Sequence, residues 1–273
     1  MKLRLFVFGI LMSTVTTTQA QSLIPELSFK NPGLKTGKGC MGDGLDGAVY
    51  IFENVGWEID ALVSILGRSS AAVTLSEVDI PGPEQNALRG TGFDNAWQPR
   101  IEYADGKAAA HQSWWMEFKI SFVKHSDRNR SISVNEFRVS GLDIDGDDDQ
   151  LHEFQSYFKI HSFSLEHQTA IFASSVLGSE TDPLLRGKRF DGTTKNYSGI
   201  SVTAEDAMVN NYYTGSSSMI VRLGAETGGT GTTSANRMYA LLFKSLSYDI
   251  PIGKKAAENM VVLNQDYPKT EKQ

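Results

Sequence analysis

The amino-acid sequence predicts an all-β protein, a single-domain antiparallel β-sandwich of jelly-roll type. Three observations support this fold class. Apolar and polar residues alternate with a period of two in several segments, as they do in strands with one buried face. Clusters of turn-forming residues, such as Pro81-Gly82-Pro83 and the glycine-rich run at 228–231, separate these segments at short intervals. Segments with a helical period are almost absent. Many short strands divided in this way are typical of an antiparallel sandwich.

The clearest strand is predicted at 114–123, where the large apolar residues fall on one face and Trp115 and polar residues fall on the other. The segment 57–65 repeats the pattern and places Trp57 and Ile59 on the core face. A third such run begins at Tyr239. In chain order, we expect strands at 50–54, 57–65, 72–78, 100–103, 114–123, 132–139, 154–160, 164–172, 219–223 and 239–243.

The first twenty residues predict a secretory signal. Lys2 and Arg4 precede an apolar stretch at 5–15, and Ala20 ends a plausible cleavage site. We therefore divide the chain into a signal peptide (1–20), an N-terminal segment (21–48), the sandwich domain (49–250) and a C-terminal tail (251–273). Within the tail, residues 256–263 are compatible with a short helix or an added strand. We expect a protein that is secreted, periplasmic or held at the cell surface.

Charge and length narrow the classes of partner. Without Lys2 and Arg4 the chain keeps 24 of its 26 basic residues against 32 acidic ones, a formal net charge of −8. Binding to nucleic acid needs a basic face, so this balance argues against it. No later segment offers the roughly twenty apolar residues of a membrane-spanning helix. Cys40 is the only cysteine, so we expect no internal disulfide and a thiol that is free or paired between chains.

The most acidic part of the chain lies at 141–153 and reads GLDIDGDDDQLHE. So many carboxylates in one loop repel one another unless water or a cation compensates, and Ca²⁺ prefers six to eight oxygen ligands. An EF-hand is excluded, because aligning Gly146 with the invariant glycine puts Gly141 at position one and His152 at position twelve. We predict instead a calcium site in a loop between two strands, with Asp148 pointing to solvent. The alternative is a solvated acidic turn. The predicted metal ligands are Asp143, Asp145, Asp147, Asp149 and Glu153.

Several short motifs, in order along the chain, carry a resemblance to a known type of module. They are the segments 50–56 and 60–61, Trp97-Gln98-Pro99-Arg100-Ile101, 118–123, and Asp143-Ile144-Asp145-Gly146 followed by Glu153. Together they resemble an uncharacterised β-sandwich module of exported bacterial surface proteins, many of which are large and adhesin-like. The resemblance covers about 50–243. It implies an extracellular, non-catalytic module in which the Asp-Ile-Asp-Gly segment ends a strand.

Two kinds of side chain bear on function. Glu58, Asp60 and Glu117 lie on the predicted non-core strand faces, where a sandwich glycosidase would carry its two carboxylates. Solvated carboxylates are far commoner at such positions, so we assign no catalytic residues. Aromatic rings on a polar face or near loops could instead stack on a sugar or contact a protein. The alternative is partial burial of these rings, as is usual for tryptophan. The candidate ligand-binding residues are Trp97, Trp115, Tyr212 and Tyr213.

These observations favour an exported, calcium-stabilised β-sandwich module that binds a surface glycan or a protein in an adhesion-type role. A glycoside hydrolase on a sandwich fold is the first alternative. A structural envelope or matrix subunit is the second. The oligomeric state is left open.

Overall fold

A computed structural model describes residues 26–80, 95–197, 199–200, 204–244 and 261–264. The predicted signal peptide and its cleavage site near Ala20 lie outside these residues. In the described part of the chain the protein is built from antiparallel strands and two short 3₁₀ turns, η1 (Ala104–Gly106) and η2 (Glu205–Ala207), with no α-helix. The all-β, antiparallel prediction is confirmed. The jelly-roll connectivity stays a prediction.

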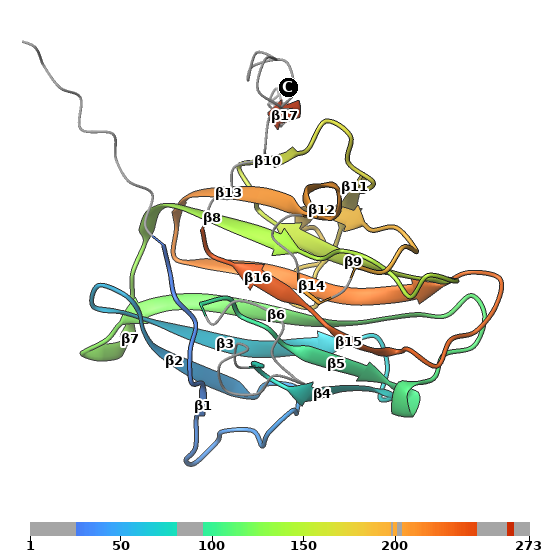
Figure 1. Cartoon of the computed structure of the whole chain (residues 1–273). Coiled ribbons are helices and arrows are strands. Elements are labelled where there is room, and N and C mark those ends of the chain that lie inside the picture. Colours follow the sequence, from blue (N-terminus) through green and yellow to red (C-terminus); the bar gives the residue numbers. More distant parts are fainter. Residues whose placement is uncertain (1–25, 81–94, 198, 201–203, 245–260, 265–273) are drawn as a thin grey trace, which may run out of the picture.

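The largest sheet has nine strands (Figure 1). A main path of eight strands runs from edge to edge, and β7 (Asp127–Ser131) pairs with one of them, β6, beside this path. The path, in spatial order, is β1 (Gly33–Leu34), β2 (Val49–Gly56), β3 (Ile59–Arg68), β6 (Ser113–Lys124), β14 (Ser218–Thr227), β9 (Leu151–Phe158), β12 (Arg186–Asp191) and β11 (Phe172–Leu177).

Two smaller sheets complete the sandwich. The five-stranded sheet has the order β16 (Ala240–Leu242), β8 (Val134–Leu142), β13 (Val209–Ser216), β10 (Ser162–Leu165) and β17 (Val261–Asn264). The three-stranded sheet has the order β15 (Asn236–Met238), β5 (Arg100–Tyr103) and β4 (Val73–Glu77). Residues 256–263 of the C-terminal tail are predicted to form a short helix or an added strand. Of these residues the structure describes 261–263, which belong to β17, a strand that pairs with β10.

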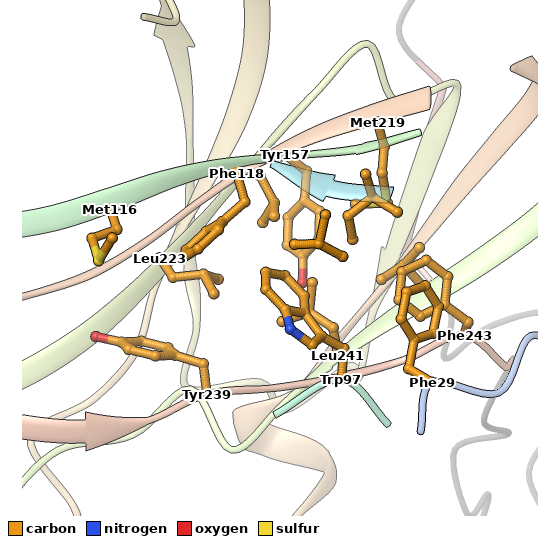
Figure 2. Close-up of a cluster of buried hydrophobic side chains, with 14 of the residues drawn as sticks. Phe29, Trp97, Met116, Phe118, Tyr157, Met219, Leu223, Tyr239, Leu241 and Phe243 are labelled. Atoms are coloured by element: carbon orange, nitrogen blue, oxygen red, sulfur yellow. The ribbon is translucent and has the colours of Figure 1, made fainter. Parts of the chain in front are cut away.

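The core lies between the nine-stranded sheet and the two smaller ones, and aromatic pairs cross it. Trp97 meets Phe118 of β6 edge-on with ring centroids 5.0 Å apart, and Phe163 of β10 meets Phe190 of β12 at the same distance. Figure 2 shows Trp97 and Phe118 in this cluster, with Tyr157, Leu223 and Leu241 around them. Aromatic pairs of this kind add about 0.5–1.5 kcal/mol each to the area they bury.

The period of two in the sequence decides which residues enter this core. The predicted strand at 114–123 corresponds to β6, and its alternating apolar residues are all buried. Along the β6–β14 ladder, Met116 lies opposite Leu223 and Phe118 lies opposite Val221, so apolar pairs line the inner face of both strands.

The structure corrects two expectations about individual segments. Trp57, predicted on the core face, lies at the turn between β2 and β3 and is 91% exposed. The predicted strand at 164–172 is two strands, β10 and β11, because the backbone turns at Glu166, whose carbonyl accepts a hydrogen bond from the Thr169 amide. The N-terminal segment contributes to the core, since the ring of Phe29 stacks on Phe243 with centroids 4.3 Å apart.

Replacing Trp97 with alanine should lower the free energy of unfolding by about 3–5 kcal/mol, because a fully buried indole leaves a cavity between the sheets. Urea unfolding of the purified protein measures this loss. Trp57→Ala is the matched control and should change the free energy by less than about 0.5 kcal/mol. Equal losses in the two variants would contradict the placement of the two indoles.

Candidate functional site

The loop between β8 and β9, residues 143–150, is called the acidic loop and joins two different sheets. It leaves β8 of the five-stranded sheet at Leu142 and enters β9 of the nine-stranded sheet at Leu151. Asp143, the first residue after β8, has a φ of 55°, which turns the chain away from the strand direction. The Asp145 carbonyl then accepts a hydrogen bond from the Glu153 amide at 2.7 Å. The loop therefore closes back on β9 and directs its first acidic side chains inward.

Asp143, Asp145 and Glu153 are buried and gather around the guanidinium of Arg237, and we call these four residues the acidic cluster. Arg237 Nε donates to Glu153 Oε1 at 2.6 Å, and its Nη2 donates to Asp145 Oδ1 at 2.8 Å and to the Gly146 carbonyl at 3.0 Å. Asp145 Oδ2 accepts a further bond from the Tyr197 amide at 2.8 Å. Three carboxyl groups thus lie near one positive charge that is 15% exposed, and two of them are bonded to it.

Two carboxyl oxygens of the acidic cluster are buried without a hydrogen-bond partner in the described part of the protein. They are Asp143 Oδ1 and Glu153 Oε2, and the hydroxyl oxygen of Tyr239 is in the same condition. A buried polar atom without a partner costs about 1–3 kcal/mol. These atoms are therefore where the cluster has capacity for a proton or a cation.

Burial controls the titration of the cluster. Burial raises the pKa of Asp143 to about 8, the charge of Asp145 adds to this rise, and Arg237 opposes it. Burial also raises the pKa of Asp145 to about 6, against the Tyr197 amide and Arg237. The pKa of Glu153 lies well above its usual range for the same reason. Asp143, which has no bond from Arg237, is the carboxyl that we expect to carry a proton at neutral pH.

The other predicted ligands lie apart from this cluster. Asp147 accepts bonds from the Leu151 amide at 3.0 Å and from the Thr232 hydroxyl at 2.6 Å, which fix the loop. Asp149 is exposed. Asp148 is exposed, as expected, and accepts a bond from the Asn196 amide. Among the residues described, no group of three or more His, Cys, Asp or Glu side chains is arranged to hold a metal ion. Calcium binding stays a prediction.

Sequence reasoning missed Arg237, which lies 84 residues after Glu153 on β15 of the three-stranded sheet. The only signal for it was indirect. Carboxylates crowded in one loop require a compensating charge, but nothing in one sequence says which basic residue supplies it.

A second feature is the hairpin of β2 and β3, which carries Trp57 at its tip. Asp60 is fully buried at its base, and its carboxylate accepts bonds from the Asn54 amide at 2.8 Å, from Arg128 Nε at 2.7 Å and, at 2.8 Å, shares one with His125 Nδ1. Burial works to raise the pKa of Asp60, but these bonds lower it, so the group is ionised. The tip is therefore held by a buried charge while its indole stands in solvent.

The candidate carboxylates of a hydrolase are committed to structural bonds, apart from the exposed Glu58. Asp60 serves the hairpin as described. Glu117 is buried and accepts bonds from Arg222 Nη2 at 2.7 Å and from the Glu180 amide at 2.8 Å. The loop after β11 is thereby fastened over the outer face of the nine-stranded sheet.

The candidate ligand-binding rings divide into two groups. Trp97 and Tyr213 are buried in the core, so the prediction that they are available for stacking is wrong. Trp97 donates to the Val78 carbonyl at 2.8 Å, and Tyr213 stacks on Phe137 at 4.8 Å. Trp115 and Tyr212 are half-buried, and an arginine guanidinium lies over each ring: Arg222 lies 4.1 Å from the Trp115 ring and Arg138 lies 5.6 Å from the Tyr212 ring.

No protein-family model matches this chain, and no curated protein is detectably related to it. In the described part of the chain no helix has the length and apolar character needed to cross a membrane.

Replacing Asp143 with asparagine should flatten the dependence of stability on pH. In the native protein the Asp143 pKa is about 8, whereas an unfolded aspartate titrates near 3.9. The native state therefore binds more protons between these values, and the wild-type free energy of unfolding falls as the pH rises through this window. This group accounts for at most about 4 kcal/mol between pH 5 and pH 8.

Urea unfolding of both proteins at pH 5 and at pH 8 tests this prediction. The free energy of unfolding of Asp143→Asn, relative to that of wild type, should be higher at pH 8 than at pH 5. Asp149→Asn changes an exposed carboxylate of the same loop and should follow wild type at both pH values. Parallel pH profiles for wild type and Asp143→Asn would contradict a raised pKa at Asp143.

Proposed function

We propose that this protein is an exported, non-catalytic module that binds a surface glycan or a protein through the Trp57 hairpin. The observation that carries the proposal is an indole that is 91% exposed on a hairpin fixed by a buried, ionised aspartate. Tryptophan is among the residues that dominate binding energy at interfaces. A pre-ordered hairpin loses little conformational freedom on binding, so more of the contact energy contributes to affinity.

The exposed indole of Trp57 is compatible with either a glycan or a protein as the ligand. An indole presents a flat apolar face that stacks on a sugar, and it also fills an apolar pocket of a protein. The basic start and apolar stretch of the first twenty residues support export.

Binding is favoured over hydrolysis by the state of the candidate acidic pairs. A glycosidase needs two carboxyl groups that reach the sugar from either side of its bond. Asp60 and Glu117 are instead buried and bonded to arginine. They serve the fold rather than a cleft.

We also propose that the acidic cluster binds Ca²⁺. The buried and unpartnered oxygens of Asp143 and Glu153 support this, with Asp145 as the third carboxylate near them. Arg237 already supplies one positive charge, so a cation would compensate the charge that remains. Asp147 and Asp149 do not fit the site, since one is bonded within the loop and the other is exposed. Bound calcium would fasten the place where the loop crosses between the sheets.

Trp57→Ala should weaken binding by at least about tenfold, or roughly 1.4 kcal/mol, while the urea midpoint stays at its wild-type value. A glycan array and a panel of immobilised extracellular proteins identify the ligand, and surface plasmon resonance then measures both affinities. Tyr212→Ala, which removes one of the two half-buried rings predicted from sequence, should bind like wild type. Loss of affinity in Tyr212→Ala alone would move the site away from the hairpin, and release of a sugar product would overturn the binding function.

Millimolar Ca²⁺ should raise the thermal midpoint, and by more at pH 8 than at pH 5, because Asp143 must lose a proton to bind the ion. At one hundred times the dissociation constant the gain is about 2.7 kcal/mol. Asp143→Asn should reduce the gain, while Asp149→Asn should leave it unchanged. Absence of both binding heat and thermal stabilisation at millimolar Ca²⁺ would contradict the calcium site.

A further inference from the structure

On one side the nine-stranded sheet ends in a strand that lacks the features that usually keep an edge strand from pairing with another chain. That strand is β11, Phe172-Ala173-Ser174-Ser175-Val176-Leu177, and it pairs with β12 on one side only in the described part of the protein. It contains no charged residue and no proline, and its register with β12 has no bulge. Natural edge strands commonly carry charged residues, proline or a β-bulge, which prevent pairing with another chain. The opposite edge, β1, is only two residues long.

The hydrogen-bond pattern shows which backbone groups of β11 face outward. The Gly178 amide donates to the Leu185 carbonyl at 2.8 Å, directly after β11 and in register with its pairing to β12. In an antiparallel ladder alternate residues bond to the same neighbour, so the even-numbered residues of β11 face β12. On the other side of β12, the Lys159 amide donates to the Arg186 carbonyl, so the even-numbered residues of β12 face β9 and its odd-numbered residues face β11. This agrees with the pattern on β11. Ala173, Ser175 and Leu177 therefore present their amides and carbonyls at the free edge.

Three large apolar side chains near this edge are exposed. Phe172 is 69% exposed, Leu177 is 62% exposed, and Leu184 of the following loop is 76% exposed. They are three of the six large apolar residues that are exposed in the described part of the chain. Phe172 and Leu177 lie at the two ends of the strand and on opposite faces of the sheet, so they flank the unpaired backbone from both faces. Exposed apolar side chains beside unpaired backbone are typical of an edge that another strand covers.

We propose that β11 pairs with β11 of a second copy of this chain, so that the two large sheets join into one. A two-fold axis perpendicular to the sheet makes the two strands antiparallel and keeps each sheet face on its own side. Residues that lie opposite one another must point to the same face of the sheet. An odd-numbered residue of one copy can therefore lie opposite only an odd-numbered residue of the other copy, and an even-numbered residue opposite only an even-numbered one. Centring the axis on Ser175 places Ser175 opposite Ser175 of the second copy and Ala173 opposite Leu177 of the second copy. This register joins the residues whose backbone groups face outward.

The charges near the edge permit this pairing. The β11 strand itself is uncharged, and the nearest cation on β12 is Lys188, whose Nζ lies 3.0 Å from Ser175 Oγ. Because each Nζ lies beside Ser175 at the proposed axis, the two ammonium groups would come closer together than the two β12 strands, but both lie in solvent, where screening weakens their repulsion. A ladder this short buries less than the roughly 1,200 Å² of a standard interface, so the dimer is concentration-dependent. Isologous two-fold dimers are also the commonest oligomers. The proposal is independent of the Trp57 hairpin and of calcium.

Sedimentation velocity of the purified protein, over about a hundredfold range of concentration up to about 1 mM, tests the dimer. Wild type should shift from monomer to dimer. Ser175→Pro should stay monomeric, and its fold should persist because the Ser175 amide does not bond to β12. Ser175→Glu and Ser175→Lys should each stay monomeric alone, because like charges then face each other across the axis. An equimolar mixture of these two should dimerise again.

Thr74→Lys on β4, the edge of the three-stranded sheet, is the matched control and should dimerise like wild type. Thermal midpoints verify that each variant is folded. If Ser175→Pro fails to fold, the mixing experiment decides alone. A wild type that is monomeric throughout the range would overturn the proposal and leave the edge to a strand of another protein. A dimer that persists unchanged in folded Ser175→Glu would also overturn it.

Discussion

The guanidinium of Arg237 is the group on which the arrangement of the three sheets depends. Arg237 belongs to the three-stranded sheet, Glu153 to the nine-stranded sheet, and Asp145 to the loop that leaves the five-stranded sheet. Loss of one partner from a buried ion pair typically costs 3–5 kcal/mol, because it leaves an uncompensated charge in the interior. The contact of Arg237 with Glu153 and Asp145 forms only when all three sheets are correctly placed. It therefore fixes their relative positions, whereas apolar packing has no preferred direction.

The same physical device recurs at two other places. Arg128 with Asp60 holds the β2–β3 hairpin, and Arg222 with Glu117 fastens the loop after β11 to the outer sheet face. In each case a buried carboxylate accepts hydrogen bonds from a guanidinium and from a backbone amide, that of Asn54 in β2 or of Glu180 in the loop after β11. The protein therefore uses buried charge to order its loops, while the alternating apolar residues of the strands supply the core. The hairpin shows why this matters for binding, since an exposed indole is useful only when its support is rigid.

The two edges of the nine-stranded sheet differ in length and in side chains. The β1 strand is two residues long and belongs to the N-terminal segment, which also contributes Phe29 to the core, whereas β11 is longer, uncharged and flanked by exposed apolar residues. The proposed pairing surface at β11 is therefore separate from the proposed ligand surface at the hairpin tip. A module with both could bind its ligand in pairs, and two linked sites raise the effective affinity without new contacts.

The sequence by itself determined the fold class and the inward face of the principal strands, because a strand's period of two is a local property that survives in any tertiary context. It also determined that Asp143, Asp145 and Glu153 would need compensation, since carboxylates crowded in one loop repel one another. The tertiary structure alone decided that Arg237, from another sheet, compensates them. It also placed Trp97 and Tyr213 inside and Trp57 outside. Alternation says which residues share a face, but the turn at Trp57 and the packing of one sheet on another decide which faces are covered.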